Sequence, residues 1–298
     1  MLVHTKRAPL IFLLLMSWAA LGQDAAPAAT PAQPLSEDQI RNLIHQTAAN
    51  DMENDKRQRD YTYIQREEQH KLDGNGQVKS TETKTTEIME LYGEQVERLI
   101  AKDDKPLSEK EAKKEEEKIQ KIIEKRKNES DEGRKKREKK EEKEREDNRR
   151  FVSEVADAYN FHFAGIETLA GRDTYVIDAE PRLGYEGHTK ESKFLPKFRF
   201  RAWIDKDESQ WKKLDIQCID TLSVGLFLAR VHKGSRIIIE QTRVNDEVWL
   251  PQHIDVKVDV RLALLKNFNV EDDITYRDYQ KFRTNTKIIP AGEVQPNP

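Results

Sequence analysis

The residues that most often perform chemistry are spread apart in this chain. Its seven His residues form no H-E-x-x-H pair or other metal-binding spacing, and neither a G-x-S-x-G motif nor a P-loop is present. The one cysteine, Cys218, lies within an alternating strand pattern, where we interpret it as a small buried hydrophobic residue. A single cysteine also excludes a disulfide within the chain. The sequence therefore predicts no catalytic residues, no metal and no cofactor, and an enzyme stays open only as an alternative that no motif supports.

One segment partly matches a calcium-binding loop. Asp73-Gly74-Asn75-Gly76-Gln77 begins such a loop, but Val78 stands at position six and Lys84 at position twelve, where the loop needs Gly and Glu. The same five residues suit a turn between two antiparallel strands. We therefore predict a hairpin turn here.

Charge is concentrated in one block. The chain has 52 basic and 55 acidic residues among 298, so 36% of it is charged, against about 25% in an average domain. Residues 101 to 150 hold 20 basic and 17 acidic side chains, and the rest of the chain has an ordinary composition. This distribution excludes a wholly disordered chain, a polytopic membrane protein and a globally basic nucleic-acid binder.

The first 22 residues have the pattern of an export signal. Lys6 and Arg7 precede a run of twelve residues, Leu10 to Leu21, that is apolar except for Ser17. Twelve residues are too few to span a bilayer, which takes about 20. We predict a cleaved signal peptide over 1–22, with an uncleaved membrane anchor as the alternative, and no transmembrane segment in the mature chain. Residues 23–35, rich in Ala and Pro, are predicted to be a linker.

The remaining sequence predicts a single domain over 36–298. Ser36 to Gln39 form a capping box before a helix at 36–57. Strand patterns surround the charged block and are separated by short turns; they cover 61–70, 77–91 and 95–101 before it, and 160–169, 174–180, 198–205, 210–220, 225–231, 235–244, 247–263 and 272–282 after it.

Alternation along these strands separates a dry face from a wet one. One face of the strand at 198–205 carries Phe198, Phe200 and Ile204, and one face of the next strand carries Leu214 and Ile216. In the strand at 247–263, charged residues alternate with Val256, Val258 and Val260. Short turns favour antiparallel neighbours, and about eleven such strands tend to curl. We predict an α+β fold, a long antiparallel meander curled into an unclosed barrel around the N-terminal helix. An outer-membrane barrel is the alternative, which dense charge on the polar faces disfavours.

The charged block itself is predicted to be helical. A second capping box begins at Ser108, pairs such as Glu109 and Lys113 have the supportive i,i+4 order, and residues 128–133 form a break. We interpret 106–150 as an inserted, solvated helical arm or helical hairpin, with a partner- or membrane-touching arm as the alternative. Balanced charge without interleaved aromatic residues argues against nucleic-acid binding.

Two adjacent segments carry a family resemblance. Arg201-Ala202-Trp203-Ile204-Asp205-Lys206-Asp207, followed by Trp211-Lys212-Lys213-Leu214, resembles the central hairpin of the LolA/LolB-like outer-membrane lipoprotein-sorting and lipoprotein-carrier family. Residues 161–282 are also similar to an exported branch of such proteins in Gram-negative bacteria. The family's lid is largely apolar, whereas residues 106–150 here are almost all charged.

The resemblance implies an unclosed barrel whose concave apolar face holds acyl chains under a helical lid. The residues implied to line that cavity are Phe198, Phe200, Ile204, Leu214, Ile216, Val256, Val258 and Val260. We expect a periplasmic protein, soluble or peripheral to a membrane, that carries or senses a lipid or a lipidated protein. The alternative is a structural or interaction protein that docks an envelope partner through 106–150.

Overall fold

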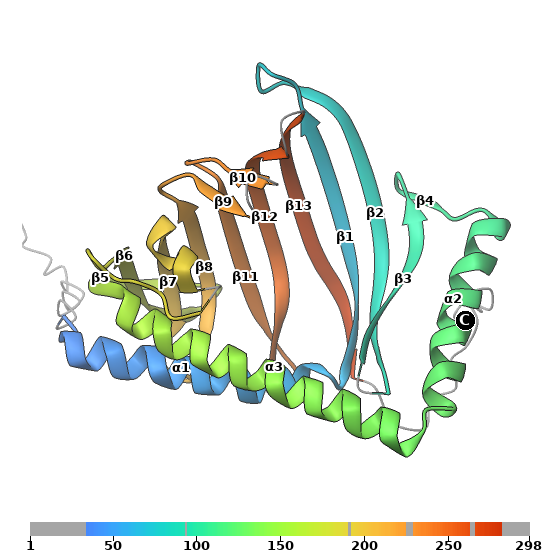
Figure 1. Cartoon of the computed structure of the whole chain (residues 1–298), viewed down its shortest axis with the longest axis horizontal. Helices are drawn as coiled ribbons and strands as arrows, with labels where there is room; N and C mark the ends of the chain where they lie inside the picture. Colours follow the sequence, from blue (N-terminus) through green and yellow to red (C-terminus); the bar gives the residue numbers. More distant parts are fainter. Residues whose placement is uncertain (1–33, 93, 190–191, 225–228, 263–265, 282–298) are drawn as a thin grey trace, which may run out of the picture. The chain divides into compact units, whose positions relative to one another are not determined.

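The fold is one antiparallel sheet that does not close on itself (Figure 1). The computed structural model describes residues 34–92, 94–189, 192–224, 229–262 and 266–281. Strand order is β4-β3-β2-β1-β13-β12-β11-β8-β7-β6-β5, and β10 joins β12 to β9. Because β4 and β5 lie at opposite ends of this order, the predicted unclosed α+β fold is confirmed.

The strands and helices follow the sequence patterns closely. The strands are β1 (Tyr61–Leu72), β2 (Val78–Leu91), β3 (Glu94–Lys102), β4 (Lys105–Pro106), β5 (Tyr159–Leu169), β6 (Arg172–Pro181), β7 (Phe198–Asp205), β8 (Trp211–Cys218), β9 (Leu222–Val224), β10 (Ala229–Val231), β11 (Arg236–Val244), β12 (Val248–Leu262) and β13 (Lys266–Lys281). The helices are α1 (Glu37–Gln58), α2 (Glu109–Lys127), α3 (Asp131–Ala158) and the short 3-10 helix η1 (Ser192–Lys197). The predicted signal peptide and most of the predicted linker lie outside the described residues.

Four details differ from the sequence-based expectation. The short strand β4 was not predicted, and β13 starts six residues before the expected 272. In place of a strand at 225–231 stand β9 and β10, with 225–228 outside the described residues. The expected break at 128–133 is shorter, because the Ser130 hydroxyl accepts the Gly133 N–H at 3.1 Å and starts α3 at Asp131.

The sheet joins two runs of strands that are distant in sequence. β1 to β4 form one run and β5 to β13 the other, and the two meet where β1 pairs with β13, for example Glu67 with Ile274. The predicted meander is therefore correct within each run except at β9 and β10, which lie off the path because β8 pairs directly with β11, and its first strand lies beside its last. This pairing places the two connections to the charged block, at β4 and β5, on opposite edges of the sheet.

The outer face of the sheet carries ladders of opposite charge. Arg201 donates to both carboxylate oxygens of Asp178, at 2.6 and 2.8 Å, and Arg236 pairs in the same way with Asp215 on β8. The calcium-like turn belongs to this polar exterior, where Asp73 accepts the N–H groups of Asn75 and Gln77 at 2.8 and 3.0 Å. These backbone hydrogen bonds lower the pKa of Asp73. The predicted wet face is thus held by cross-strand ion pairs.

Helix α1 begins with the predicted capping box and is fixed to the sheet by amide side chains. Ser36 and Gln39 satisfy each other's backbone N–H groups at the start of the helix. Near its end, Asn54 donates to the carbonyl oxygen of Trp249 at 2.7 Å and accepts the N–H of the same residue at 2.8 Å. A buried amide thereby continues the backbone pairing of β12.

Replacing Asn54 with alanine should lower the free energy of unfolding by about 2 kcal/mol, since it leaves the Trp249 N–H without this acceptor, whereas the Trp249 carbonyl oxygen keeps its hydrogen bond from Gln58 at 2.8 Å. Chemical denaturation followed by circular dichroism measures the change. Asn50→Ala is the matched control, because Asn50 lies on the same helix and only donates, to the carbonyl oxygens of Glu208 and Ser209. Equal stability of the two variants would contradict the assigned role of Asn54.

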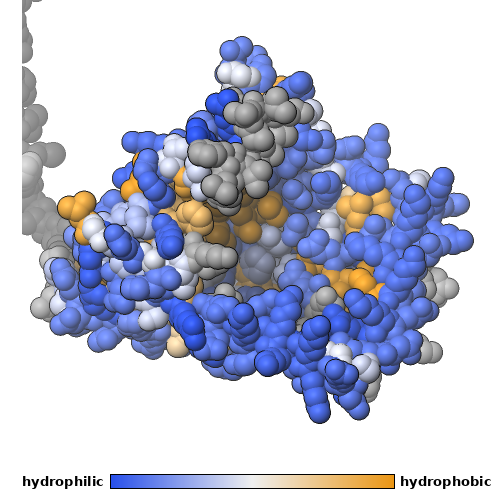
Figure 2. All heavy atoms as spheres, viewed as in Figure 1, coloured by the Kyte–Doolittle hydropathy of each residue, from blue (hydrophilic) through white to orange (hydrophobic). Residues whose placement is uncertain are grey.

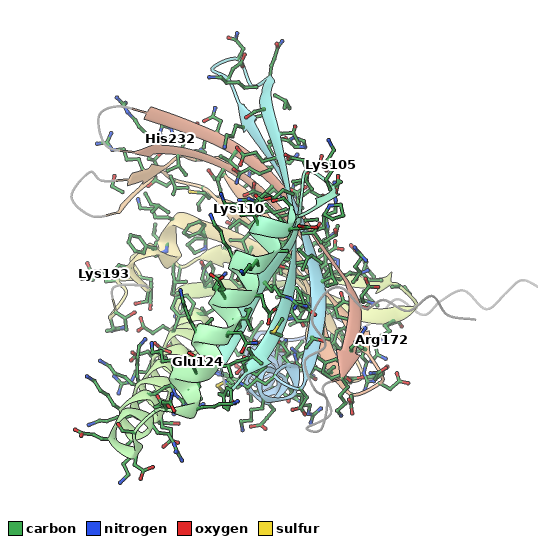
Figure 3. The ribbon with its side chains drawn as sticks, turned by 90° about the vertical axis from the view of Figure 1, so that its right-hand side faces the viewer. Lys105, Lys110, Glu124, Arg172, Lys193 and His232 are labelled. Carbon is green, nitrogen blue, oxygen red and sulfur yellow. The ribbon has the colours of Figure 1, made fainter. Side chains whose placement is uncertain are left out.

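The charged block forms a strap between the two edges of the sheet. We call α2 and α3 together, residues 109–158, the helical strap. Ile119 and Ile123 of α2 are buried against Met89, Leu91 and Val96 of β2 and β3. Figure 3 shows α2 in front of these strands, with Lys110 near its start and Glu124 near its end. The solvated-arm interpretation is therefore incomplete, because one face of α2 belongs to the core.

The corner between α2 and α3 is held by one carboxylate. Glu129 accepts from Arg126 at 3.1 Å and from Arg137 at 3.0 Å, and these hydrogen bonds lower its pKa. From this corner α3 returns alongside α1 in the opposite direction (Figure 1). Arg41 near the start of α1 donates to the carbonyl oxygen of Ala156 near the end of α3, at 3.0 Å. Within the described residues, no helix combines the length and apolar character needed to cross a bilayer.

In the part of the chain that the structure describes, buried apolar residues form three separate clusters. The largest joins α1 and the end of α3 to β5, β6 and β7, and it includes Ile40, Tyr159 and Ile204. The second lies beneath α2, and the third gathers Tyr61, Val248 and Leu250 at the end of α1. Because these clusters are separate, the inner face of the sheet is not filled continuously by side chains.

Candidate functional site

A cavity of about 750 Å³ lies between the sheet and the two long helices. Apolar side chains from α1, α3, η1, β7, β8 and β11 line most of it, and charged residues of α1 and α3 surround one side. Figure 2 shows the molecule hollowed on this side, with apolar atoms inside and hydrophilic residues around them. The size lies within the range of about 300–1,000 Å³ that is usual for small-molecule sites.

Five of the eight residues that sequence reasoning named line this cavity. They are Phe198, Phe200, Ile204, Leu214 and Ile216, from β7 and β8. Direct cross-strand pairing of Phe200 with Ile216 puts these two on one face. Whether the cavity holds a ligand stays a prediction.

Val256, Val258 and Val260 of β12 are not among the cavity's lining residues. They lie on the same inner face, one strand farther along. Val256 pairs with Ile237, which lines the cavity and itself pairs with Ile216. The three valines thus continue the apolar surface beyond the cavity.

This continuation is a half-buried apolar trough across β11, β12 and β13. Paired residues share a face, so the register defines its members as Ile237, Ile239, Ile254, Val256, Val258, Val260, Val270 and Ile274. All are half-buried, and none belongs to the three clusters. A partly exposed apolar surface of this kind, continuous with a cavity, is typical of a binding groove.

The inner face becomes polar where β13 meets β1. Val256 is followed across the sheet by Asp272 and then by Gln69. Within the described residues, the Oδ1 atom of Asp272 is buried and has no hydrogen-bond partner. The inner face is therefore apolar over β7 to β12, mixed on β13, where Asp272 lies between Val270 and Ile274, and polar on β1.

The helices supply lining residues that sequence reasoning missed. Ile44 and Met52 of α1 and Phe151, Val152 and Val155 of α3 all face the cavity. Helical spacing marks each group as an apolar stripe, which is the signal that could have found them. What the spacing could not show is that the two stripes meet over the same strands.

One carboxylate projects into the end of the cavity from α1. Asp51 accepts the indole N–H of Trp211 at 2.8 Å and the amide N–H of Gln210 at 2.9 Å, both on Oδ1. Burial raises the pKa of Asp51, although these two hydrogen bonds partly oppose the rise. Asp51 thus ties α1 to the start of β8.

The mouth of the cavity carries four cationic side chains. Lys56 comes from the last turn of α1, Arg59 is the C-cap residue that follows this helix, and Arg145 and Arg149 come from α3. On α1 each cation has its own carboxylate, Glu53 for Lys56 at 2.6 Å and Asp55 for Arg59 at 3.1 Å. The two arginines of α3 share one carboxylate, that of Glu142.

The remaining candidate groups have structural partners. His253 lies on the outer face and contacts Asp273 at 2.8 Å. Cys218 is buried, as expected, and its Sγ lies 3.1 Å from the carbonyl oxygen of Asp220. Within the described ranges, no three His, Cys, Asp or Glu side chains are grouped so that they could hold a metal ion.

The chain is similar to several solved structures. A structure described as an outer membrane lipoprotein-sorting protein domain from Vibrio parahaemolyticus aligns with a TM-score of 0.34 and 11% identity, over 82% of this chain and 95% of the other. A LolA superfamily protein from Nitrosomonas europaea aligns with a TM-score of 0.30 and 9% identity, over 83% and 94%. A DUF1329 family protein from Desulfovibrio piger gives 0.32 and 11%, over 83% and 94%.

No family model matches the sequence, and no curated protein matches it. The similarities to solved structures concern the fold alone. They do not identify a ligand.

Proposed function

We propose that this protein is a non-enzymatic binder of a lipid-like amphiphile, which it carries or senses in the periplasm. The observation that supports the proposal is the cavity of about 750 Å³, lined chiefly by apolar side chains and open toward charged residues of α1 and α3. An acyl chain would contact Phe200, Leu214 and Ile237 inside. Burial of apolar surface would provide the driving force, at about 25 cal/mol per Å².

Mass spectrometry of organic extracts from natively purified protein tests the proposal. We expect an amphiphile to co-purify, and we expect the emptied protein to bind an environment-sensitive hydrophobic dye. A protein that yields no amphiphile and binds no dye while folded would overturn the proposal.

Filling the cavity should remove this binding. Leu214→Trp places a larger side chain among the lining residues of β8, so we expect at least tenfold weaker dye binding, measured by fluorescence titration. Gln217→Trp is the matched control on the same strand, since Gln217 lies on the outer face beside Arg199. Circular dichroism verifies that both variants fold. Unchanged dye binding by the Leu214 variant would place the dye elsewhere.

A second candidate function is docking of an envelope partner through residues 106–150. It has the support of exposed charged side chains between Asp131 and Arg150 of α3. Replacing Lys135, Lys136, Lys139 and Lys140 with glutamine leaves the buried face of α2 untouched. If this function holds, the fourfold variant should keep the wild-type unfolding midpoint and lose partners that crosslink to the wild-type strap in the periplasm.

A further inference from the structure

Two arginines at the cavity mouth lie on one face of α3. Arg145 and Arg149 both line the cavity and are spaced i,i+4, so their side chains are neighbours on the helix, with Cβ atoms about 6 Å apart. Phe151, Val152 and Val155 follow on the same helix and line the apolar interior. A ligand chain lying against these three residues would bring its polar end to the two arginines.

The hydrogen-bonding capacity of the two guanidinium groups is largely unused. Arg145 donates its Nε–H to Glu142 Oε2 at 3.1 Å, and Arg149 donates from an Nη to Glu142 Oε1, also at 3.1 Å. These are their only partners among the described residues. Each guanidinium has five N–H donors, so most of the donors remain available.

The two arginines also share a single carboxylate partner. One carboxylate, Glu142, serves two arginines, and the hydrogen bonds from them lower its pKa. Glu53 and Asp55 are paired with cations of α1, and Asp51 is engaged by Trp211 and Gln210. None of these three carboxylates neutralises the second arginine of α3.

We infer that the ligand is an amphiphile with an anionic head group, a carboxylate or a phosphate, which Arg145 and Arg149 bind at the cavity mouth. This inference rests on the proposed function. Guanidinium groups pair with such oxyanions through two parallel N–H bonds, which are stronger than bonds between neutral groups. An uncharged head group could not form such charge-assisted pairs with the free N–H donors of Arg145 and Arg149.

Three ligands with the same oleoyl chain test the inference. Oleic acid carries a carboxylate, oleoyl lysophosphatidic acid carries a phosphate, and monoolein is uncharged. Dye displacement from the full mature protein gives the three dissociation constants. We expect the two anionic ligands to bind at least tenfold more tightly than monoolein, and the tighter of the two identifies the head group.

Paired variants separate specific recognition from net charge. Arg145→Gln with Arg149→Gln should remove the preference for anions, while monoolein binds as before. Lys143→Gln with Arg150→Gln makes the same change in charge on the same helix, at residues that do not line the cavity, and should keep the preference.

The outcomes distinguish the two levels of the proposal. Equal affinity of the wild type for all three ligands, or a preference that survives in the Arg145 and Arg149 variant, would overturn the inference and leave lipid binding intact. Binding of none of the three, with no dye binding, would overturn the proposed function and the inference with it.

Discussion

Replacing Asp205 with alanine should lower the free energy of unfolding by about 3–5 kcal/mol, among the largest effects of any single change in this chain. The Asp205 side chain is 0% exposed and accepts two hydrogen bonds from Arg172, at 2.5 and 2.8 Å. It also accepts the N–H groups of Asp207 and Glu208 in the turn between β7 and β8. Alanine at this position removes the acceptor of the Arg172 Nε–H and of both turn N–H groups, while Arg172 keeps its hydrogen bond to Glu208 at 3.0 Å.

Urea denaturation of the wild type and the variant measures this effect. Asp207→Ala is the matched control, because the Asp207 side chain belongs to the same turn, is 82% exposed and lies 3.7 Å from Arg172. Its loss should change stability by less than about 0.5 kcal/mol. Similar stabilities of the two variants would contradict the importance of burial at Asp205.

Lowering the pH should also show how much the ionised Asp205 carboxylate contributes to stability. Burial raises the pKa of Asp205, but the hydrogen bonds from Arg172 and the Glu208 N–H outweigh it, so the pKa lies below its usual value. A carboxyl group with a lowered folded-state pKa stabilises the protein above its unfolded-state pKa, near 3.8, and this stabilisation is lost as pH falls below that value. We expect the wild type to lose more stability than Asp205→Ala when the pH is lowered from 5 to 3.

Replacing Ile119 with alanine should cost about 2–4 kcal/mol and detach α2 from the sheet. Ile119 is 1% exposed and packs with Met89, Leu91 and Val96 in the second cluster. Since the rest of α2 is mainly Glu, Lys and Arg, few other apolar contacts hold the helix. Limited proteolysis should therefore cut the variant near Lys113 and Lys118 earlier than the wild type.

Ile122→Ala is the control for this prediction. This substitution removes the same atoms from the same helix, but Ile122 is only half-buried at the edge of the cluster. We expect a loss below about 1 kcal/mol and the wild-type proteolysis pattern. If both isoleucines behaved alike, α2 would be held by its ion pairs, such as Lys102 with Glu111 at 2.8 Å.

Capping and alternation patterns predicted the helices and strands well, because the formation of these elements depends on residues that are close in sequence. The capping boxes at Ser36 and Ser108 start their helices as expected, and the alternation at 198–205 and 211–218 puts one face of the hairpin toward the cavity. Pairing of β1 with β13 could not be predicted in this way. That pairing depends on which strand edges remain after the hairpins form, and this is a property of the whole sheet.

The lining of the cavity could likewise be predicted only where it depends on a local sequence pattern. Phe200 and Leu214 were identifiable because alternation defines a face, whereas Val256 has the same alternation and lies beyond the lining. The sequence pattern did not mark Arg145 and Arg149 as cavity residues, because almost every residue around them is charged. Only the return of α3 alongside α1 brings Arg145 and Arg149 to the mouth.

The helical strap also sets a fixed distance between its two attachment points. Its helix α3 has 28 residues and would span about 42 Å at 1.5 Å per residue. One end is fixed at the Glu129 corner and the other by Phe151 and Val155 in the core. Inserting one residue between these anchors would rotate one relative to the other by about 100°, whereas inserting seven would nearly restore the phase. An insertion of seven would also move the anchors about 10 Å farther apart, so the fixed ends constrain the number of residues in α3 through both phase and length.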